Sequence, residues 1–342
     1  MARADVQVRT GARRARKRSL VALALAACVA LAACGDDGGS GDGGTSASGG
    51  SGEEKLIMFE LSFPCGLNQV ATQLCRGAED AGRALPAGFE FELKTGVEYA
   101  DNVAYNNLIQ TSLQLRPAGL ILFPAGPAAQ TPTINRACDE GVKIIIVDSP
   151  ATGVKCQESF IGADHRKLGV DSAKWLIEHP PASREIGIVT QQPGQYASTD
   201  ARVEGFRETI EDAGYRVVAT VVTDLALDRT RTLVSNMMTA HPNIGAVFSG
   251  NGPMGQGTAQ ALKGNRRVVQ LSVDGFFEDV RLILAGDVSA NAATNPYAIG
   301  KLAVEYMARA IDGEEVPRET LTSSKVIDRT NAQQYIDEGG LR

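Results

Sequence analysis

Short runs of apolar residues alternate with longer segments of mixed polarity along the chain from position 56 onward. The runs are continuously apolar, which is typical of parallel strands covered on both faces, and the segments between them are long enough for crossover helices. The pattern therefore predicts doubly wound α/β structure. The first set of predicted strands is 56–61, 89–93, 119–123 and 143–147, separated by helices at 68–85, 101–115 and 130–141.

The same succession begins again in the second half of the chain. Predicted strands at 185–190, 215–222, 245–248 and 268–273 alternate with helices at 201–213, 229–240 and 254–262. Two local echoes accompany the repeat. The segment from Gly77 to Gly82 resembles the one from Gly205 to Gly214, and 117–124 resembles 242–249. The consistent order of these echoes indicates two similar lobes, each with a doubly wound parallel sheet.

Polar or aromatic residues follow several of the predicted strands. They are Ser62 and Phe63, Asp148, Asn251 and Asp274. Ligands of open parallel sheets bind outside the carboxyl ends of the strands, so two facing sheets would form a cleft with polar walls. Each residue alone is equally well explained as a turn or helix cap. Several of them at equivalent strand ends favour a binding site.

The N-terminal 33 residues form a separate segment of opposite charge. They carry seven Arg or Lys residues and one Asp, and the uncharged stretch 19–33 is shorter than the roughly 20 residues that a membrane span needs. This is typical of a signal peptide. The stretch ends in Leu31-Ala32-Ala33-Cys34, which resembles the lipobox of bacterial lipoproteins, in which the cysteine is acylated after cleavage. An ordinary cleavage site is the alternative, and the Arg13-Arg14 pair leaves the choice of Sec or twin-arginine export open.

A tether follows the predicted lipidation site. Residues 34–54 begin with Cys34 and are rich in Gly and Ser, so they cannot bury enough apolar surface to fold. We therefore expect an exported chain that is lipid-anchored to the outer face of the cell membrane, on the periplasmic side where a second membrane exists.

Charge and cysteine content narrow the classes of function. The 342-residue chain has a formal net charge of −6, and because residues 1–33 contribute +6, the remainder carries −12. This strongly negative charge beyond residue 33 argues against nucleic-acid binding. The four cysteines beyond the tether are even in number, and local separation favours Cys65–Cys75 and Cys138–Cys156 disulfides, with free thiols as the alternative. The three histidines are far apart in sequence, so no metal site is expected.

Five ordered blocks resemble a known family, the ribose-type periplasmic sugar-binding proteins, which are type I solute-binding proteins of ABC importers. The resemblance covers 55 to about 330, and a lipoprotein signal precedes it where the related repressors have a DNA-binding domain. The blocks are Phe160-Ile161-Gly162-Ala163-Asp164…Gly169, Asp200-Ala201-Arg202-Val203-Glu204-Gly205-Phe206, Phe248-Ser249-Gly250-Asn251…Met254…Gly257…Ala261-Leu262, Val273-Asp274-Gly275 and Ala293-Thr294-Asn295-Pro296-Tyr297…Ile299-Gly300.

The resemblance implies two Rossmann-like lobes joined by a three-segment hinge. The crossovers are expected near 163–164, 294–295 and 322, which assigns 55–163 with 295–322 to the N-terminal lobe and 164–294 with 323–342 to the C-terminal lobe. The family's ligand contacts correspond to Asp148, Arg202, Asn251 and Asp274. Their planar carboxylate, amide and guanidinium groups suit the hydroxyls of a sugar.

The chain also departs from the family pattern at several positions. His165 stands where an Asn is common, Thr294 where the hinge has Gln, and Gly252 where an Asp is usual. The aromatic pair that stacks on ribose aligns near Val70-Ala71, so Phe63, Tyr196, Phe276 or Phe277 would have to supply an apolar face. The candidate ligand-binding residues are Ser62, Phe63, Asp148, His165, Arg202, Asn251, Asp274 and Thr294.

The predicted function is that of a monomeric, non-enzymatic substrate-binding lipoprotein of an ABC importer. It would capture a sugar, a polyol or a similar small polar solute by hinge closure, without a cofactor, and deliver it to a membrane permease. One alternative is a receptor that presents its ligand to a sensor kinase or chemoreceptor. A remote alternative is an NAD-dependent oxidoreductase, because Gly250-Asn251-Gly252-Pro253-Met254-Gly255 matches the G-x-G-x-x-G fingerprint, with Asp274 beyond it.

Overall fold

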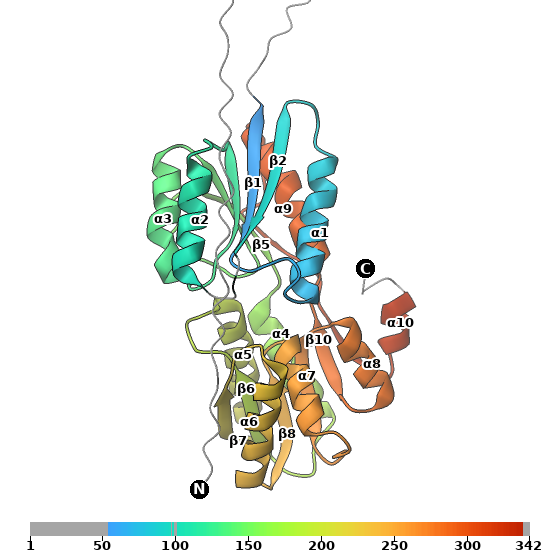
Figure 1. The fold of residues 1–342 in the computed structure, drawn as a ribbon. Coiled ribbons are helices and arrows are strands. Elements are labelled where there is room, and N and C mark those ends of the chain that lie inside the picture. Colours follow the sequence, from blue (N-terminus) through green and yellow to red (C-terminus); the bar gives the residue numbers. More distant parts are fainter. Residues whose placement is uncertain (1–53, 97, 99–100, 338–342) are drawn as a thin grey trace, which may run out of the picture. The chain divides into compact units, whose positions relative to one another are not determined.

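The computed structural model describes residues 54–96, 98 and 101–337, which belong to one compact unit (Figure 1). The predicted signal peptide, Cys34 and the tether up to residue 53 lie outside the described residues. Within the described part of the chain, no helix combines the length and the apolar character that a membrane crossing requires.

The first lobe is built on a fully parallel six-stranded sheet in the order β11-β5-β4-β3-β1-β2. Its helices pack on both faces of the sheet. The strands are β1 (Lys55–Leu61), β2 (Phe89–Thr95), β3 (Gly119–Phe123), β4 (Lys143–Val147), β5 (Gln157–Gly162) and β11 (Glu319–Leu321), and the helices are α1 (Gln69–Arg83), α2 (Asn102–Leu113), α3 (Pro127–Asp139) and α9 (Pro296–Ile311).

The second lobe repeats this arrangement with the sheet order β12-β10-β9-β8-β6-β7. Only β12 runs antiparallel to its neighbour among the strand pairs described for this sheet. Its strands are β6 (Glu185–Thr190), β7 (Arg216–Val222), β8 (Ile244–Ser249), β9 (Val269–Asp274), β10 (Ala290–Ala293) and β12 (Lys325–Asp328), and its helices are α4 (His165–Glu178), α5 (Ala197–Asp212), α6 (Leu227–Ala240), α7 (Gly252–Ala261), α8 (Phe277–Ala285) and α10 (Ala332–Asp337).

The chain passes between the two sheets three times. It leaves the first sheet after β5 and enters α4 of the second lobe at residues 163–164, and it returns between β10 and α9 at 294–295. The third crossing, at 322–324, joins β11 of the first sheet to β12 of the second. The doubly wound, two-lobe fold class predicted from the hydrophobic pattern is confirmed.

Paired glycines let one pair of helices in each lobe pack closely. A Cβ atom on Gly77 of α1 would lie 2.1 Å from the Tyr297 carbonyl oxygen of α9, and one on Gly300 would lie 2.1 Å from the Leu74 oxygen. In the second lobe Gly205 of α5 and Gly169 of α4 make the same kind of contact. The sequence echo between Gly77 and Gly205 therefore has a packing cause, because no larger residue fits at either position.

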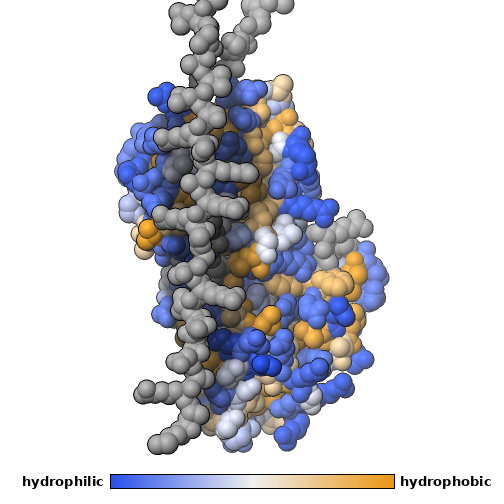
Figure 2. All heavy atoms as spheres, in the orientation of Figure 1, coloured by the Kyte–Doolittle hydropathy of each residue, from blue (hydrophilic) through white to orange (hydrophobic). Residues whose placement is uncertain are grey.

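The apolar strands account for the cores of both lobes. All five residues of β3 are buried, with Ile121 facing one helical layer and Leu122 the other. Charged and polar residues cover most of the face seen in Figure 2, with apolar residues scattered between them. The structure also has the Cys65–Cys75 and Cys138–Cys156 disulfides that local separation favoured.

Some elements differ from the predicted ones. Helix α5 begins at Ala197 rather than at 201, and α7 begins at Gly252 rather than at 254. The added residues are small or polar in α5 (197–200) and Gly and Pro in α7 (252–253), and they carry no apolar periodicity. Strands β10 and β12 have only four residues each, and the run Ala290–Ala293 lacks the β-branched residues that mark a strand.

Candidate functional site

A small cavity lies between the two lobes, at the carboxyl ends of their strands. Its volume is about 60 Å³. The first lobe supplies the lining residues Phe63, Asn68, Val70, Phe123 and Asp148, and the second supplies Gln191, Tyr196, Ser198, Thr199, Arg202, Leu225, Asn251, Pro253 and Asp274. The cleft predicted from the polar strand ends is thus present in the structure.

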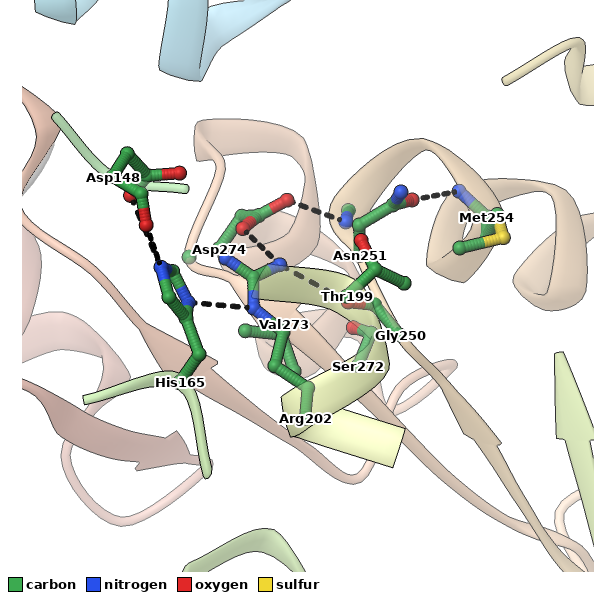
Figure 3. Close-up of polar contacts among 12 residues, drawn as sticks. Asp148, His165, Thr199, Arg202, Gly250, Asn251, Met254, Ser272, Val273 and Asp274 are labelled. Atoms are coloured by element: carbon green, nitrogen blue, oxygen red, sulfur yellow. Dashed lines mark hydrogen bonds and ion pairs between the residues drawn. The ribbon is translucent and has the colours of Figure 1, made fainter. Parts of the chain in front are cut away.

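Arg202 is the only cation among the residues that line this cavity. The residue is 5 % exposed, and its side chain extends from α5. Nη1 donates to the Gly250 carbonyl oxygen at 3.0 Å and forms an ion pair with Asp274 Oδ1 at 2.9 Å (Figure 3). The second carboxylate oxygen of Asp274 accepts from the Gly252 N–H at 2.9 Å. Arg202 and Asp274 therefore fix each other on the wall formed by the second lobe.

His165 connects Arg202 to the first lobe. Arg202 Nε donates to His165 Nδ1 at 3.1 Å, so Nδ1 carries a lone pair and the proton of the ring lies on Nε2. Nε2 then donates to the Asp148 carbonyl oxygen at 2.7 Å. Asp148, His165, Arg202 and Asp274 thus form one continuous chain of contacts that runs from one lobe to the other (Figure 3).

The carboxylate of Asp148 faces the cavity and stays ionised. Burial opposes its ionisation, but the adjoining His165 and the charge of Arg202 outweigh burial and lower the pKa of Asp148 below its ordinary value. The nearest partner of this carboxylate is His165 Nε2, 3.4 Å from Oδ1. Asp148 therefore presents a hydrogen-bond acceptor to whatever occupies the cavity.

Asn251 is both a helix cap and a lining residue. Its Oδ1 accepts from the Met254 N–H at 3.1 Å and caps α7, while its Nδ2 donates to Gln191 Oε1 at 3.1 Å. The Thr199 hydroxyl donates to the same Gln191 oxygen at 2.9 Å. Asn251 can therefore cap α7 with its oxygen and still line the cavity, so the two explanations offered for this residue do not exclude each other.

Aromatic side chains form the apolar part of the cavity wall. The rings of Phe63 and Phe123 meet edge to face at 4.9 Å, and Tyr196 lies 6.3 Å from Phe123. Tyr196 precedes α5 of the second lobe but packs into the core of the first. Of the other aromatic candidates, Phe276 and Phe277 lie outside the cavity lining. Phe276 packs against Gly252, and Phe277 is 48 % exposed.

The structure brings five of the eight candidate residues into the cavity wall: Phe63, Asp148, Arg202, Asn251 and Asp274. His165 lies behind Arg202 and borders a second hollow of about 500 Å³ near the crossing segments. Ser62 and Thr294 are buried but do not line the cavity. The Thr294 N–H donates to the Asp274 backbone oxygen at 3.4 Å. Sequence reasoning missed Gln191 and Phe123, although both stand at strand ends, where the same rule applies.

The space beside the glycines of the G-x-G-x-x-G segment is occupied by other residues of the protein. A Cβ atom on Gly252 would lie 2.7 Å from the ring of Phe276, and one on Gly255 would lie 2.5 Å from the Ser272 Cβ. The N-terminus of α7, where a pyrophosphate would bind, is occupied by the Asp274 carboxylate. These glycines serve internal packing. Among the described residues, no three His, Cys, Asp or Glu side chains gather as a metal site would require.

A family model described as the periplasmic binding protein domain matches residues 59–315 of this chain. The chain belongs to this family. Two relatives of this periplasmic binding protein are the D-allose-binding periplasmic protein of Escherichia coli and the D-ribose/D-allose-binding protein of Pseudomonas aeruginosa. The first is 23 % identical over 74 % of this chain and 84 % of the relative. The second is 26 % identical over 46 % of this chain and half of the relative's length.

Solved structures of the family share the fold of this periplasmic binding protein. An ABC transporter solute-binding protein from Mycobacterium smegmatis, crystallised with bound glycerol, superposes with a TM-score of 0.74 at 25 % identity. The superposition covers 83 % of this chain and 97 % of the solved one. The two-lobe architecture is therefore that of the family.

Proposed function

We propose that this protein is the substrate-binding component of an ABC importer and that it binds a sugar or polyol in the cavity between its lobes. The observation that carries the proposal is the set of buried polar groups that reach this cavity from both lobes. Asp148 offers carboxylate acceptors from the first lobe, and Arg202 and Asn251 offer donors from the second. A ligand that bridges them stabilises the closed arrangement of the lobes.

Hydroxyl groups are the ligand chemistry that these residues match best. A hydroxyl donates one hydrogen bond and accepts others, so adjacent hydroxyls can donate to Asp148 and accept from Arg202. Among the described residues no hydrogen bond engages Nη2 of Arg202, whereas Nε and Nη1 are fully used within the protein. The aromatic wall of Phe63, Phe123 and Tyr196 suits the C–H face of a sugar ring.

The names of the relatives support the same class of ligand. The two relatives are named for binding D-ribose and D-allose, and the solved mycobacterial protein holds glycerol. We extend the polyhydroxylated class to this chain without choosing one member, because Val70 and Ala71 replace the aromatic pair that the resemblance implies for ribose.

Lobe closure is the mechanism that we infer for capture. Besides the bond between His165 and Asp148, two hydrogen bonds join the lobes: Gly126 N–H donates to the Gln195 oxygen at 2.7 Å, and Phe277 N–H donates to Gln69 Oε1 at 2.6 Å. A ligand shifts the lobes toward closure only through its higher affinity for the closed state. We propose that the closed form, a monomer anchored through lipid on Cys34, then docks on the permease.

The proposal contains no catalytic step. The glycine motif that suggested a dinucleotide is packed against Phe276 and Ser272, and its helix N-terminus is occupied by Asp274. The polar groups of the cavity are arranged as donors and acceptors for binding, and the relatives are named as binding proteins.

Thermal unfolding of the full chain with a panel of D-ribose, D-allose, myo-inositol and nucleosides tests the proposal. A ligand that binds the folded state raises the melting temperature by an amount that grows with the logarithm of its excess over Kd. We expect at least one sugar or polyol to raise the melting temperature. Arg202→Lys should abolish this increase, because the single ammonium group of Lys cannot replace the N–H donors of the planar guanidinium group. Arg207→Lys, on the same helix but outside the cavity, is the matched control and should keep the shift. No shift with any sugar or polyol would contradict the proposal.

A further inference from the structure

The turn that carries Asp274 is held in a conformation that costs energy. Asp274 has a φ of 100° and Gly275 a φ of 72°. A positive φ is unfavourable for a residue with a side chain and persists only where the surroundings enforce it. Side chains that hold this turn therefore decide where the Asp274 carboxylate points.

Asn291 holds the turn from the neighbouring strand β10. Its Oδ1 accepts from the Gly275 N–H at 2.7 Å. Its Nδ2 donates to Ser272 Oγ at 2.7 Å and to Asp279 Oδ2 at 3.1 Å, so the orientation of the amide is fixed on both sides. The side chain is 1 % exposed. Asn291 is therefore a buried polar residue whose side-chain hydrogen bonds hold the segment around Asp274 in place.

Asp279 holds the next residue of the turn. Its Oδ2 accepts from the Phe276 N–H at 3.2 Å, which also fixes the start of α8. Burial, together with the neighbouring charge of Asp274, raises the pKa of Asp279 well above its ordinary value. The hydrogen bonds that Asp279 Oδ2 accepts from Phe276 and Asn291 therefore link this turn to the start of α8.

We propose that Asn291 and Asp279 are positioning residues for ligand binding: by accepting from the N–H groups of Gly275 and Phe276, they aim Asp274 at Arg202 and the Gly252 N–H. This inference rests on the proposed function of the cavity. Neither residue lines the cavity, so both act through Asp274.

The equivalent turn of the first lobe is built differently. The Asp148 N–H donates to the Ile161 oxygen at 2.9 Å, the Ser149 N–H donates to the Val147 oxygen at 2.7 Å, and the Asp148 oxygen accepts from His165. Backbone bonds and one histidine take the place of the buried Asn and Asp. The bracing by Asn291 and Asp279 is thus particular to the wall that holds Arg202.

Four variants of the full chain test the inference, titrated calorimetrically with the sugar or polyol that stabilises the wild-type protein. Asn291→Ala and Asp279→Ala should each weaken binding by about tenfold or more, which corresponds to a loss of about 1.4 kcal/mol. Asp279→Asn should bind as the wild type, because the amide oxygen of Asn can accept the same hydrogen bonds from Phe276 and Asn291. Asn331→Ala is the control: this amide holds the β12–α10 turn of the same lobe, away from the cavity.

Each result decides for or against the inference. Wild-type affinity in Asn291→Ala, or equal weakening in Asp279→Asn and Asp279→Ala, would overturn it, as would a similar loss in Asn331→Ala. If Asn291→Ala does not fold, Asn291→Ser replaces it, because a serine hydroxyl is too short to reach Gly275.

A ligand-free measurement separates this inference from the proposed function. Crystal structures of the wild type and Asn291→Ala should differ in the turn, with the contact between Arg202 Nη1 and Asp274 Oδ1 lost in the variant. An unchanged contact would overturn the positioning role even if the cavity binds no sugar, whereas a lost contact in a protein without sugar affinity would contradict only the proposed function.

Discussion

Asp148 and Asp274 occupy the same position in the two lobes, and both have a positive backbone φ. Asp148 follows β4 and Asp274 ends β9, which are the third strands of their sheets, and their φ angles are 57° and 100°. Strained residues of this kind cluster at functional sites, where the surroundings compensate their cost. The duplicated fold thus aims two strained carboxylates at one cavity from opposite sides.

Replacement of Asp148 by Asn separates its role in binding from its role in the fold. Asn tolerates a positive φ, and the Asp148 backbone oxygen still accepts from His165, so the free energy of unfolding should change by less than about 1 kcal/mol. Affinity for the sugar or polyol should fall by about tenfold or more, because an acceptor that the ligand uses is lost. Calorimetric titration and urea unfolding measure the two effects.

Asp139→Asn provides the matched control for this prediction. Asp139 lies on the exposed side of α3, where it pairs with Lys155, and it is remote from the cavity lining. The control should keep both affinity and stability. Full affinity in Asp148→Asn would exclude its carboxylate from the ligand contacts.

Glu60 should make the stability of the protein depend on pH. It is fully buried in β1, and burial raises its pKa from 4.5 to about 7, against smaller opposing effects of Ser112 and Lys94. Between these two values the folded state holds a proton that the unfolded state has released. The free energy of unfolding therefore falls as the pH rises from about 4.5 to 7, by roughly 3 kcal/mol from this residue.

Glu60→Gln removes this contribution because the amide does not titrate. Urea unfolding between about pH 5 and 8 should show a flatter pH dependence for Glu60→Gln than for the wild type, with the variant gaining relative stability at the alkaline end. Glu90→Gln, on the exposed face of the edge strand β2, is the control and should leave the wild-type slope. Equal slopes for Glu60→Gln and the wild type would show that Glu60 does not hold this proton.

The two disulfides should differ in their effect on binding. They close loops with sequence separations of 10 and 18 residues, so the loss of either should cost about 3 kcal/mol of stability. Cys65–Cys75 also ties the segment between Phe63 and Asn68, two lining residues, to helix α1. Replacing Cys65 and Cys75 by Ser should therefore weaken sugar affinity as well as stability.

Cys138–Cys156 serves as the internal control for that prediction. It joins α3 to the segment before β5, and neither cysteine lines the cavity. Its replacement by two serines should lower the melting temperature without changing affinity once the protein is folded. Equal loss of affinity in both double variants would argue against a specific role of the Cys65–Cys75 loop.

Much of the fold follows from the sequence for identifiable physical reasons. The strands at 119–123, 143–147 and 185–190 have the predicted bounds because their apolar runs are buried on both faces and are followed by Pro124, Asp148 and Gln191. The strand-end rule also located Asp148, Asn251 and Asp274, since parallel strands deliver their carboxyl ends to one edge.

The rest of the site depends on contacts that sequence separation conceals. The packing of α4 against α5 decides whether His165 contacts a ligand or Arg202. It brings Arg202 Nε within 3.1 Å of His165 Nδ1, although the two residues are 37 positions apart in the sequence. Tyr196 enters the core of the opposite lobe, a contact that no local pattern encodes. Asn291 lies in a strand of four residues, Ala290–Ala293, that is too short and too rich in alanine to be read as a strand at all.

A crystal structure of the full chain, grown with the sugar or polyol that most raises its melting temperature, tests the central claim most directly. We expect the ligand to lie between the lobes, with hydroxyl groups within hydrogen-bond distance of Asp148 and of Nη2 of Arg202. Its C–H face should lie toward Phe63, Phe123 and Tyr196. A ligand bound elsewhere on the molecule, or in the cavity without contact to Asp148 and Arg202, would contradict this claim.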